Sequence, residues 1–264
     1  MITPCFYKPS QNGDAFMLSV SKSATVGPSN RKFLMGGVNT AIALEAAEKV
    51  CERPVVYASS QFLSYALLGD TVDVDVSKLS EGRSVTQANV VNRVGGREIL
   101  RANVALGSRD NTHDVQFFSM PEVPKPADCD EVVDSNLAED DLGAHTEKRV
   151  CFEDNAAGVG LVWIRITDDF PVTIGKIALI ADYLAGAIPR TRGASSLDNQ
   201  VKVISRTPTD WFLCETRMAA FASGFLHGET RIFAEDGSLI ALASQSAALP
   251  KEGGDWTQSQ ARQV

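Results

Sequence analysis

The sequence predicts an α+β protein in which two curved antiparallel sheets each wrap around one central helix. Three observations lead to this prediction. Residues 35–50 contain two glycines followed by helix-favouring, mostly small apolar residues. Strand-like segments lie on both sides of this helix in the sequence. Turns and a second apolar helix then recur about 140 residues later, which indicates an internal duplication.

The helix expected at residues 35–50 carries four alanines spread around its axis, so we expect it to be covered on most faces. The first N–H groups of a helix lack intrahelical partners, and Gly36 and Gly37 lie at this point. A ligand oxygen can approach these donors closely because no side chain intervenes. Alternatively, the glycines only relieve crowding between helix and sheet. Asn39, in the first turn, can cap the helix or contact a ligand.

The remaining elements of the first half follow from alternating apolar residues and from turn signals. Phe16, Leu18 and Val20 alternate with polar residues and predict a first strand. After the helix, further strands are expected at residues 55–65, 72–76, 84–94 and 97–106. Turns rich in glycine and acidic residues separate them at residues 69–70, 81–82 and 95–96.

Residues 108–149 differ in composition, with three closely spaced prolines followed by a cluster of acidic residues. Such a segment cannot bury enough apolar area to offset its ordering entropy. We expect it to lie on the surface as a linker. The chain is accordingly divided into an N-terminal unit at residues 1–110, an acidic linker at 111–150 and a C-terminal unit at 151–264.

The second half repeats the first in element order and spacing. The turn at Asp70 has a counterpart at Asp210, 140 residues later, and the turn at residues 95–96 has one at residues 236–237, 141 residues later. We expect the two halves to superpose. The predicted elements are a helix at residues 174–185 and strands at residues 158–166, 199–204, 211–217, 225–233 and 239–247.

Composition limits the possible functions. A net charge of −8 and a pI of about 5.0 argue against a nucleic-acid-binding protein. The five cysteines are scattered without metal-ligand spacing, and we expect neither a metal nor a cofactor. No segment resembles a signal peptide or a membrane span, so we expect a cytoplasmic location. No P-loop, dinucleotide fingerprint or G-x-S-x-G nucleophile motif is present.

Several segments, taken in order and spacing, resemble the acyl-CoA thioesterase II family of the thioesterase-like superfamily. The segments are residues 35–41, 62–70, 163–165, 197–199, 210–211 and 236–245. The resemblance implies a double hotdog fold, with one hotdog unit in each half. It also implies an acyl-CoA substrate and hydrolysis of the thioester without a metal or a covalent intermediate. We further expect a homo-oligomer.

The polar centre of this family combines an Asp, a Thr or Ser, and a Gln, which together orient the attacking water. Carried over by position, the Asp falls on Asp198 and the Gln on Gln245. Arg217 occupies the position that matches the hydroxyl residue, with Thr216 beside it. Because neighbouring strand residues point to opposite faces, Thr216 and Arg217 cannot both face one cleft without a bulge.

Other interpretations of these residues remain open. Asp198 can be an ordinary turn residue, and Gln245 can lie on the solvent side of its strand. We expect Asp198 and Gln245 to come within reach of one water molecule, with Thr216 as the hydroxyl and Gly36, Gly37, Asn39 and Arg217 as substrate contacts.

The sequence therefore predicts an acyl-CoA thioesterase in which Asp198 and Gln245 orient the attacking water. The alternative is a non-catalytic acyl-CoA-binding protein in which Arg217 has replaced the hydroxyl. Two basic pairs, Arg31 with Lys32 and Arg190 with Arg192, can meet the phosphates of CoA or can be solvated surface charge.

Overall fold

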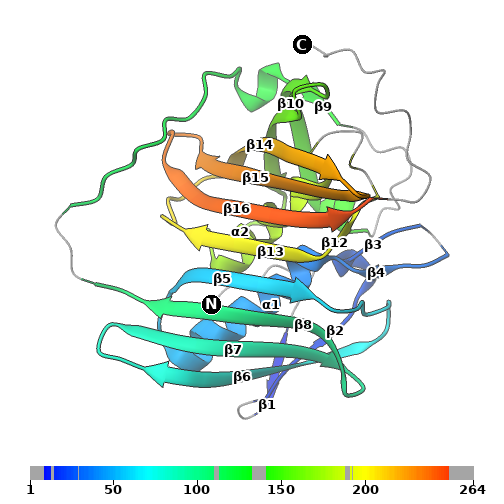
Figure 1. Cartoon of the computed structure of the whole chain (residues 1–264), viewed down its shortest axis with the longest axis vertical. Helices are drawn as coiled ribbons and strands as arrows, with labels where there is room; N and C mark the ends of the chain where they lie inside the picture. The colour runs from blue at the N-terminus through cyan, green and yellow to red at the C-terminus, as the bar shows by residue number, and fades with distance from the viewer. Residues whose placement is uncertain are drawn as a thin grey trace.

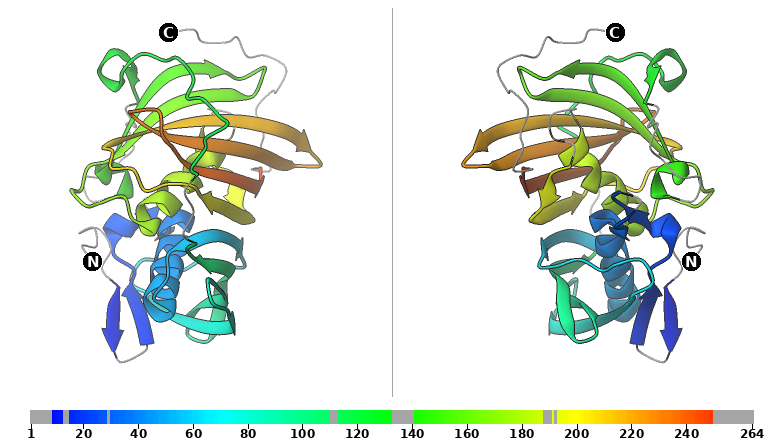
Figure 2. Two further views of the ribbon diagram at one scale, coloured as in Figure 1. Left: turned by 90° about the vertical axis from the view of Figure 1, so that its left-hand side faces the viewer. Right: turned by 90° about the vertical axis from the view of Figure 1, so that its right-hand side faces the viewer.

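Two buried helices, α1 (Gly36–Cys51) and α2 (Ile174–Ala181), lie inside one long, curved antiparallel sheet (Figures 1 and 2). The structure is a computed structural model that describes residues 9–12, 15–28, 30–109, 113–132, 141–187, 191 and 193–249. This arrangement confirms the predicted α+β class, with one helix wrapped by each half of the sheet.

The strands follow one another across the sheet in a mirrored order. The first half contributes β1 (Ser10–Asn12), β2 (Ala15–Ser19), β6 (Thr71–Glu81), β7 (Val85–Val94), β8 (Arg97–Gly107) and β5 (Val55–Phe62). The second half continues with β13 (Asp198–Val203), β16 (Leu239–Ala248), β15 (Phe225–Ala234), β14 (Trp211–Ala222), β11 (Val159–Ile166), β10 (Thr146–Asp154) and β9 (Asp130–Glu131). Strand β12 (Ser195–Ser196) pairs with β16, and β3 (Thr25–Val26) pairs with β4 (Phe33–Leu34).

The two halves join where β5 and β13 run antiparallel, from Asp198 opposite Gln61 to Lys202 opposite Tyr57 (Figure 1). On either side of this seam the strands occur in the same relative order. Strands β6 and β14 begin 140 residues apart, and so do β7 and β15. The duplication inferred from the turns therefore corresponds to two units related across the seam.

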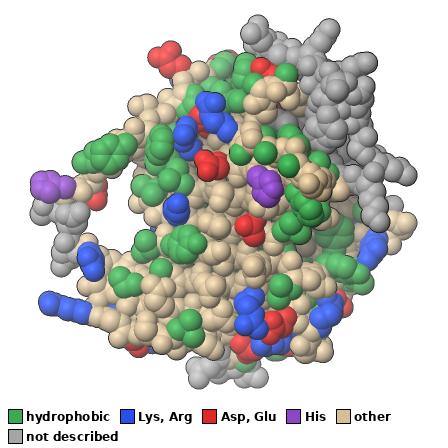
Figure 3. Space-filling view, viewed as in Figure 1, with side chains coloured by type: hydrophobic (Ala, Val, Ile, Leu, Met, Phe, Trp, Pro, Cys, Tyr) green, Lys and Arg blue, Asp and Glu red, His purple; other side chains and the backbone are tan. Residues whose placement is uncertain are grey.

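On the outer face of the sheet, charged side chains of both signs are interspersed (Figure 3).

Small residues allow α1 to be covered by the sheet and by α2 together. Every residue from Gly37 to Ala47 is buried. Helix α2 begins after Thr173, whose side chain accepts a hydrogen bond from the Lys176 N–H at 3.2 Å. It ends at Ala181, and the chain continues as a 3₁₀ helix (Asp182–Gly186), so the helix predicted at residues 174–185 changes type partway. No helix in the described part of the chain is long and apolar enough to cross a membrane.

Residues 113–132 cross the outside of the second half, and most of their side chains are exposed. Three hydrogen bonds between this segment and the second half fix this course. The Gln116 side chain donates to the Gly237 carbonyl at 3.0 Å and accepts from the Leu239 N–H at 2.6 Å, while the Trp163 indole N–H donates to the Pro124 carbonyl at 3.0 Å. This part of the segment therefore follows the surface, as its composition indicates.

The end of the predicted linker does not follow the surface but contributes a buried ion pair and a strand. Residues 133–140, which carry part of the acidic cluster, lie outside the described residues. Asp141 is buried and pairs with Lys32 of the first half at 2.6 Å. Strand β10 then begins at Thr146, within the predicted linker. The sequence did not predict this strand, because most of its side chains are half-buried and the apolar alternation of a one-sided strand is weak.

Candidate active site

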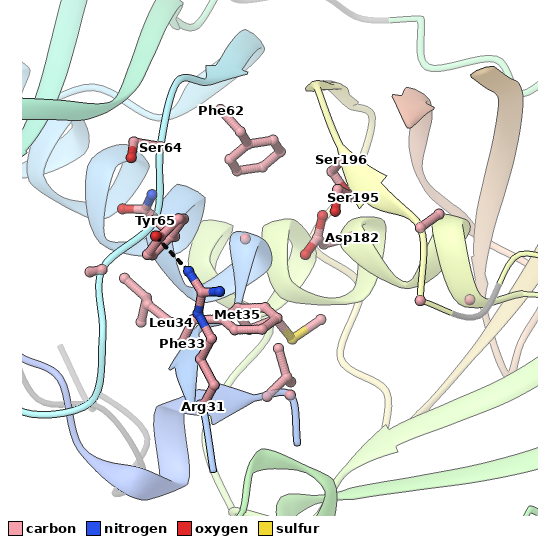
Figure 4. Close-up of a pocket in the computed structure, with 18 of the residues that line it drawn as sticks. Arg31, Phe33, Leu34, Met35, Phe62, Ser64, Tyr65, Asp182, Ser195 and Ser196 are labelled. Atoms are coloured by element: carbon pink, nitrogen blue, oxygen red, sulfur yellow. Dashed lines mark hydrogen bonds between the residues drawn. The ribbon is translucent and has the colours of Figure 1, made fainter. Parts of the chain in front are cut away.

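A cavity of about 690 Å³ lies between the two halves, at the start of α1 (Figure 4). The first half supplies the β3–β4 hairpin, the first turn of α1 and the loop after β5. The second half supplies the 3₁₀ turn after α2 and strand β12. The cavity is lined by Val26, Gly27, Arg31, Phe33, Leu34, Met35, Gly36, Asn39, Phe62, Leu63, Ser64, Tyr65, Ala66, Asp182, Tyr183, Gly186, Gly193, Ala194, Ser195 and Ser196.

Asp182 is the acidic residue in this lining. It lies directly after α2, and its side chain points at the first turn of α1. One carboxylate oxygen accepts a hydrogen bond from the Gly37 N–H at 2.6 Å, and the other accepts one from the Gln245 side-chain amide at 2.7 Å. Burial raises the pKa of Asp182 to about 6, although the hydrogen bonds from Gln245 and Gly37 and the nearby Asn199 amide act in the opposite direction.

Gln245 connects Asp182 to a hydroxyl group. Its side-chain nitrogen donates to Asp182 and also to the Ser196 hydroxyl oxygen, at 3.0 Å. Gln245 is itself buried in β16, and Ser196 belongs to β12, which pairs with the end of β16. A continuous polar chain therefore runs from the Gly37 N–H through Asp182 and Gln245 to Ser196. Its members come from four different elements, so it exists only in the folded protein.

Close packing of the two helix ends explains both glycines at the start of α1. A Cβ atom on Gly37 would lie 2.9 Å from the Asp182 Cβ and 3.0 Å from the Leu179 Cα. A Cβ atom on Gly36 would lie 3.0 Å from an Asp182 carboxylate oxygen. The crowding at Gly37 comes from Asp182 and the end of α2 and not from the sheet, and the Gly37 N–H serves Asp182 instead of an open ligand site. The Gly36 N–H has no hydrogen-bond acceptor among the described residues, and Gly36 lines the cavity.

Asn39 also lines the cavity, and it does not cap the helix. The residue at the cap position is Met35, whose side chain forms no capping hydrogen bond. The Asn39 side-chain oxygen accepts a hydrogen bond from Asn92 of β7 at 2.8 Å, and the same Asn92 amide donates to the Asn39 carbonyl at 2.9 Å. Both asparagines are buried, so the orientation of Asn39 is fixed by the sheet beneath it.

The structure does not bring Asp198, Thr216 and Gln245 together. One Asp198 carboxylate oxygen accepts the backbone N–H of Ser246, the neighbour of Gln245, at 2.6 Å. Asn199 and Val201 are the buried residues at this end of β13, and the pairing of Gln200 with Ser244 sets Asp198 in line with Ser246, so Asp198 lies on the face away from the buried Gln245. Of the three expected catalytic residues, only Gln245 joins the polar chain, and Asp182 replaces Asp198 in the candidate site.

The two candidates for the hydroxyl position lie on β14, away from the cavity lining. The Thr216 hydroxyl meets that of Thr230 on β15 at 2.8 Å, inside the second half. Arg217 forms an ion pair with Glu215 at 2.9 Å. The hydroxyl that Gln245 contacts is that of Ser196. It precedes β13 and reaches Gln245 because β12 pairs with β16, a pairing that no local pattern in the sequence reveals.

One signal in the sequence pointed to Asp182. It is the lone carboxylate in the apolar run at residues 177–185, and a carboxylate in such a run is expected to be buried and hydrogen-bonded. No group of three or more His, Cys, Asp or Glu side chains in the described part of the chain is arranged to hold a metal ion. The hydrogen-bonded set of Asp182, Gln245 and Ser196 is therefore the centre of the candidate site.

Two family models match the chain in succession. The acyl-CoA thioesterase N-terminal domain matches residues 27–107, and the acyl-CoA thioesterase C-terminal domain matches residues 126–249. No curated protein sequence matches the chain.

Solved structures of similar proteins cover nearly the whole chain. A putative thioesterase from Novosphingobium aromaticivorans is 31% identical with a TM-score of 0.85, over 92% of this chain and 98% of that one. A hot dog fold protein of unknown function from Alicyclobacillus acidocaldarius is 18% identical with a TM-score of 0.81, over 92% and 96%. Acyl-CoA thioesterase II TesB2 from Mycobacterium marinum is 19% identical with a TM-score of 0.74, over 92% and 97%. The chain therefore belongs to the acyl-CoA thioesterase family, a family of thioester hydrolases with the double hotdog fold.

Proposed function

We propose that this protein hydrolyses acyl-CoA thioesters, with Asp182 as the general base for an attacking water molecule. One observation carries the proposal: a buried carboxylate with a raised pKa lines the cavity and is joined through Gln245 to a serine hydroxyl. A base whose pKa lies near 6 is ionised at neutral pH and still accepts a proton readily. In this proposal Asp182, Gln245 and Ser196 together hold and activate the water molecule.

The first step forms a carbon–oxygen bond. The ionised Asp182 accepts a proton from water as the water oxygen attacks the thioester carbonyl carbon, while the Ser196 hydroxyl fixes the orientation of that water. Gln245 fixes the Asp182 and Ser196 side chains relative to each other through its two donated hydrogen bonds. Such positioning lowers the barrier because little reorganisation is needed when the proton moves.

Negative charge then develops on the carbonyl oxygen. The N–H of Gly36 lies at the start of α1, where the helix dipole also favours an anion. The tetrahedral intermediate collapses by breaking the carbon–sulfur bond. The departing CoA thiolate takes the proton from Asp182, so that the products are the carboxylic acid and CoA-SH, and Asp182 is ionised again.

The non-catalytic alternative rests on Arg217 occupying the hydroxyl position. The Ser196 hydroxyl lies beside Gln245 at 3.0 Å, which supports hydrolysis over this alternative. The direct test is a panel of acyl-CoA esters of different chain lengths, assayed by release of free thiol. Turnover of one or more esters supports hydrolysis, whereas tight binding of every ester without thiol release would favour the binding protein.

The pH profile gives a more specific prediction. Asp182 works in its ionised form, so kcat/KM should rise about tenfold per pH unit below pH 6 and level off above it. The hydrogen bond donated by Gln245 lowers the pKa of Asp182. In Gln245→Leu the inflection should therefore move to higher pH, in addition to any loss of rate. A thiol-release assay from pH 4.5 to 8.5 measures both, and a flat wild-type profile would exclude Asp182 as the base.

A further inference from the structure

Two arginines converge on one tyrosine at the edge of the cavity. Arg31 precedes β4, and its guanidinium donates to the Tyr65 hydroxyl at 2.6 Å with its central carbon 5.0 Å from the ring centroid (Figure 4). Arg97, at the start of β8, lies 5.9 Å from the same centroid and donates to the Tyr65 carbonyl at 3.1 Å and to the Ser64 hydroxyl. Two positive charges are thus held beside a single aromatic ring.

Neither charge is neutralised within the described part of the chain. No carboxylate of those residues lies within ion-pair distance of Arg31 or Arg97, whereas Lys32, next to Arg31, is paired with the buried Asp141. The chain as a whole carries a net charge of −8, so an uncompensated basic pair is a local exception. Two like charges held together favour an anion between or beside them.

The position of this pair relates it to the candidate active site. Arg31, Ser64 and Tyr65 line the same cavity as Asp182 and Ser196, and Figure 4 shows them on opposite sides of it. The side chains of Arg31, Ser64 and Tyr65 are polar or charged and partly open to solvent. This end of the cavity therefore suits an anionic group better than an acyl chain. An acyl-CoA carries its phosphates on the far side of the thioester from the acyl chain.

We propose that Arg31 and Arg97, held by Tyr65, bind the phosphate groups of the CoA moiety and so determine the direction in which the substrate enters. The identity of the ligand rests on the proposed function, while the anion site itself rests on the geometry. Lys32, the other residue of the basic pair in the sequence, is excluded from this role by its ion pair with Asp141. The Tyr65 hydroxyl and ring orient the Arg31 guanidinium.

The test compares two substrates with the same acyl group, the CoA ester and the S-acyl-pantetheine that lacks the phosphates. In Arg31→Ala/Arg97→Ala, we expect KM for the CoA ester to rise by at least about tenfold, because the charge-assisted hydrogen bonds to the phosphates are lost. We expect kcat for the CoA ester, and both constants for the pantetheine ester, to stay unchanged. Arg101→Ala is the matched control, because that exposed arginine is already paired with Glu98 at 2.8 Å.

Added salt gives a second readout. Raising the KCl concentration should increase KM of the wild type for the CoA ester but should barely affect the double variant. An equal KM for the CoA ester in wild type and double variant would overturn the anion site while leaving the hydrolytic function intact.

Binding of CoA itself, measured by titration calorimetry, separates this proposal from the proposed function. If the wild type hydrolyses no thioester but binds CoA, and the double variant loses that binding, the anion site stands and the hydrolytic proposal fails. If both proteins bind CoA equally, the anion site is overturned.

Discussion

Replacing Asp182 with Asn should reduce kcat by about 10²-fold or more, the range usual for loss of a general base. The asparagine has nearly the same shape and keeps one acceptor oxygen, but it cannot take up the proton of the attacking water. The Gly37 N–H and the Gln245 amide both donate to the wild-type carboxylate, at 2.6 and 2.7 Å. Thiol release from the best acyl-CoA ester measures the loss.

Asp198→Asn is the matched control, because it makes the same chemical change two residues after Ser196 at a side chain that does not line the cavity. Its carboxylate accepts the Ser246 N–H at 2.6 Å, and the asparagine oxygen can still do so. We expect this variant to keep wild-type activity. Loss of activity in Asp198→Asn together with full activity in Asp182→Asn would restore the assignment drawn from the sequence and refute the one drawn from the structure.

The stability of Asp182→Asn provides an independent check on the raised pKa. The folded state binds the Asp182 proton more tightly than the unfolded state does, because burial raises the pKa from 3.8 to about 6. Wild-type stability therefore falls as pH rises from about 4 to 6, by on the order of 3 kcal/mol from this group. The asparagine variant lacks this dependence. As pH rises over the same interval, its unfolding free energy should therefore increase relative to that of the wild type.

The second large effect is expected for Lys32→Met, which should lower the free energy of unfolding by about 3–5 kcal/mol. Lys32 and Asp141 are almost completely buried, with side-chain exposures of 11% and 4%. Removing the ammonium group takes the Lys32 cation away from the buried Asp141 carboxylate. Lys32 also donates to the Gly27 carbonyl at 2.8 Å, so the β3–β4 hairpin at the cavity wall loses an anchor. Chemical denaturation measures the change.

Lys78→Met is the control for this prediction, since Lys78 pairs with Glu81 in solvent, with exposures of 37% and 51%. Exposed pairs contribute about 0–1 kcal/mol, so little change is expected. Adding Asp141→Leu to Lys32→Met should recover much of the lost stability, because the buried carboxylate that has lost Lys32 is then removed. Equal losses in Lys32→Met and Lys78→Met would mean that the buried pair contributes no more than a surface pair.

The fold could be predicted because its signals are local and repeated. The alanines and glycines of α1, the alternation in β6 and the turn at residues 236–237 each specify their element without reference to the rest of the chain. The repeat at 140 residues then supplied the arrangement. Strand β10 lacked such a signal, because its half-buried side chains mix charged and apolar residues.

The candidate site depends on contacts that no local pattern encodes. Gln245 could be identified because an amide within a small apolar strand must find partners when buried. Asp182 and Ser196 are brought to it by the end of a helix and by a two-residue strand, 63 and 49 residues away in the sequence. Asp198 was favoured by its place in the sequence, but the direction of its side chain depends on strand register, which a one-residue shift reverses.

The antiparallel seam between β5 and β13 has an evolutionary consequence. A half-length chain would leave one of these strands as an unpaired edge, and pairing two copies of it would close the same seam. In such a symmetric pair every residue appears twice, so each catalytic group must be tolerated at both positions. Fusion into one chain removes that constraint. Gly37 can then evolve as a donor in the first unit while Asp182, Ser196 and Gln245 evolve in the second, and the counterpart positions are free to serve packing or substrate choice.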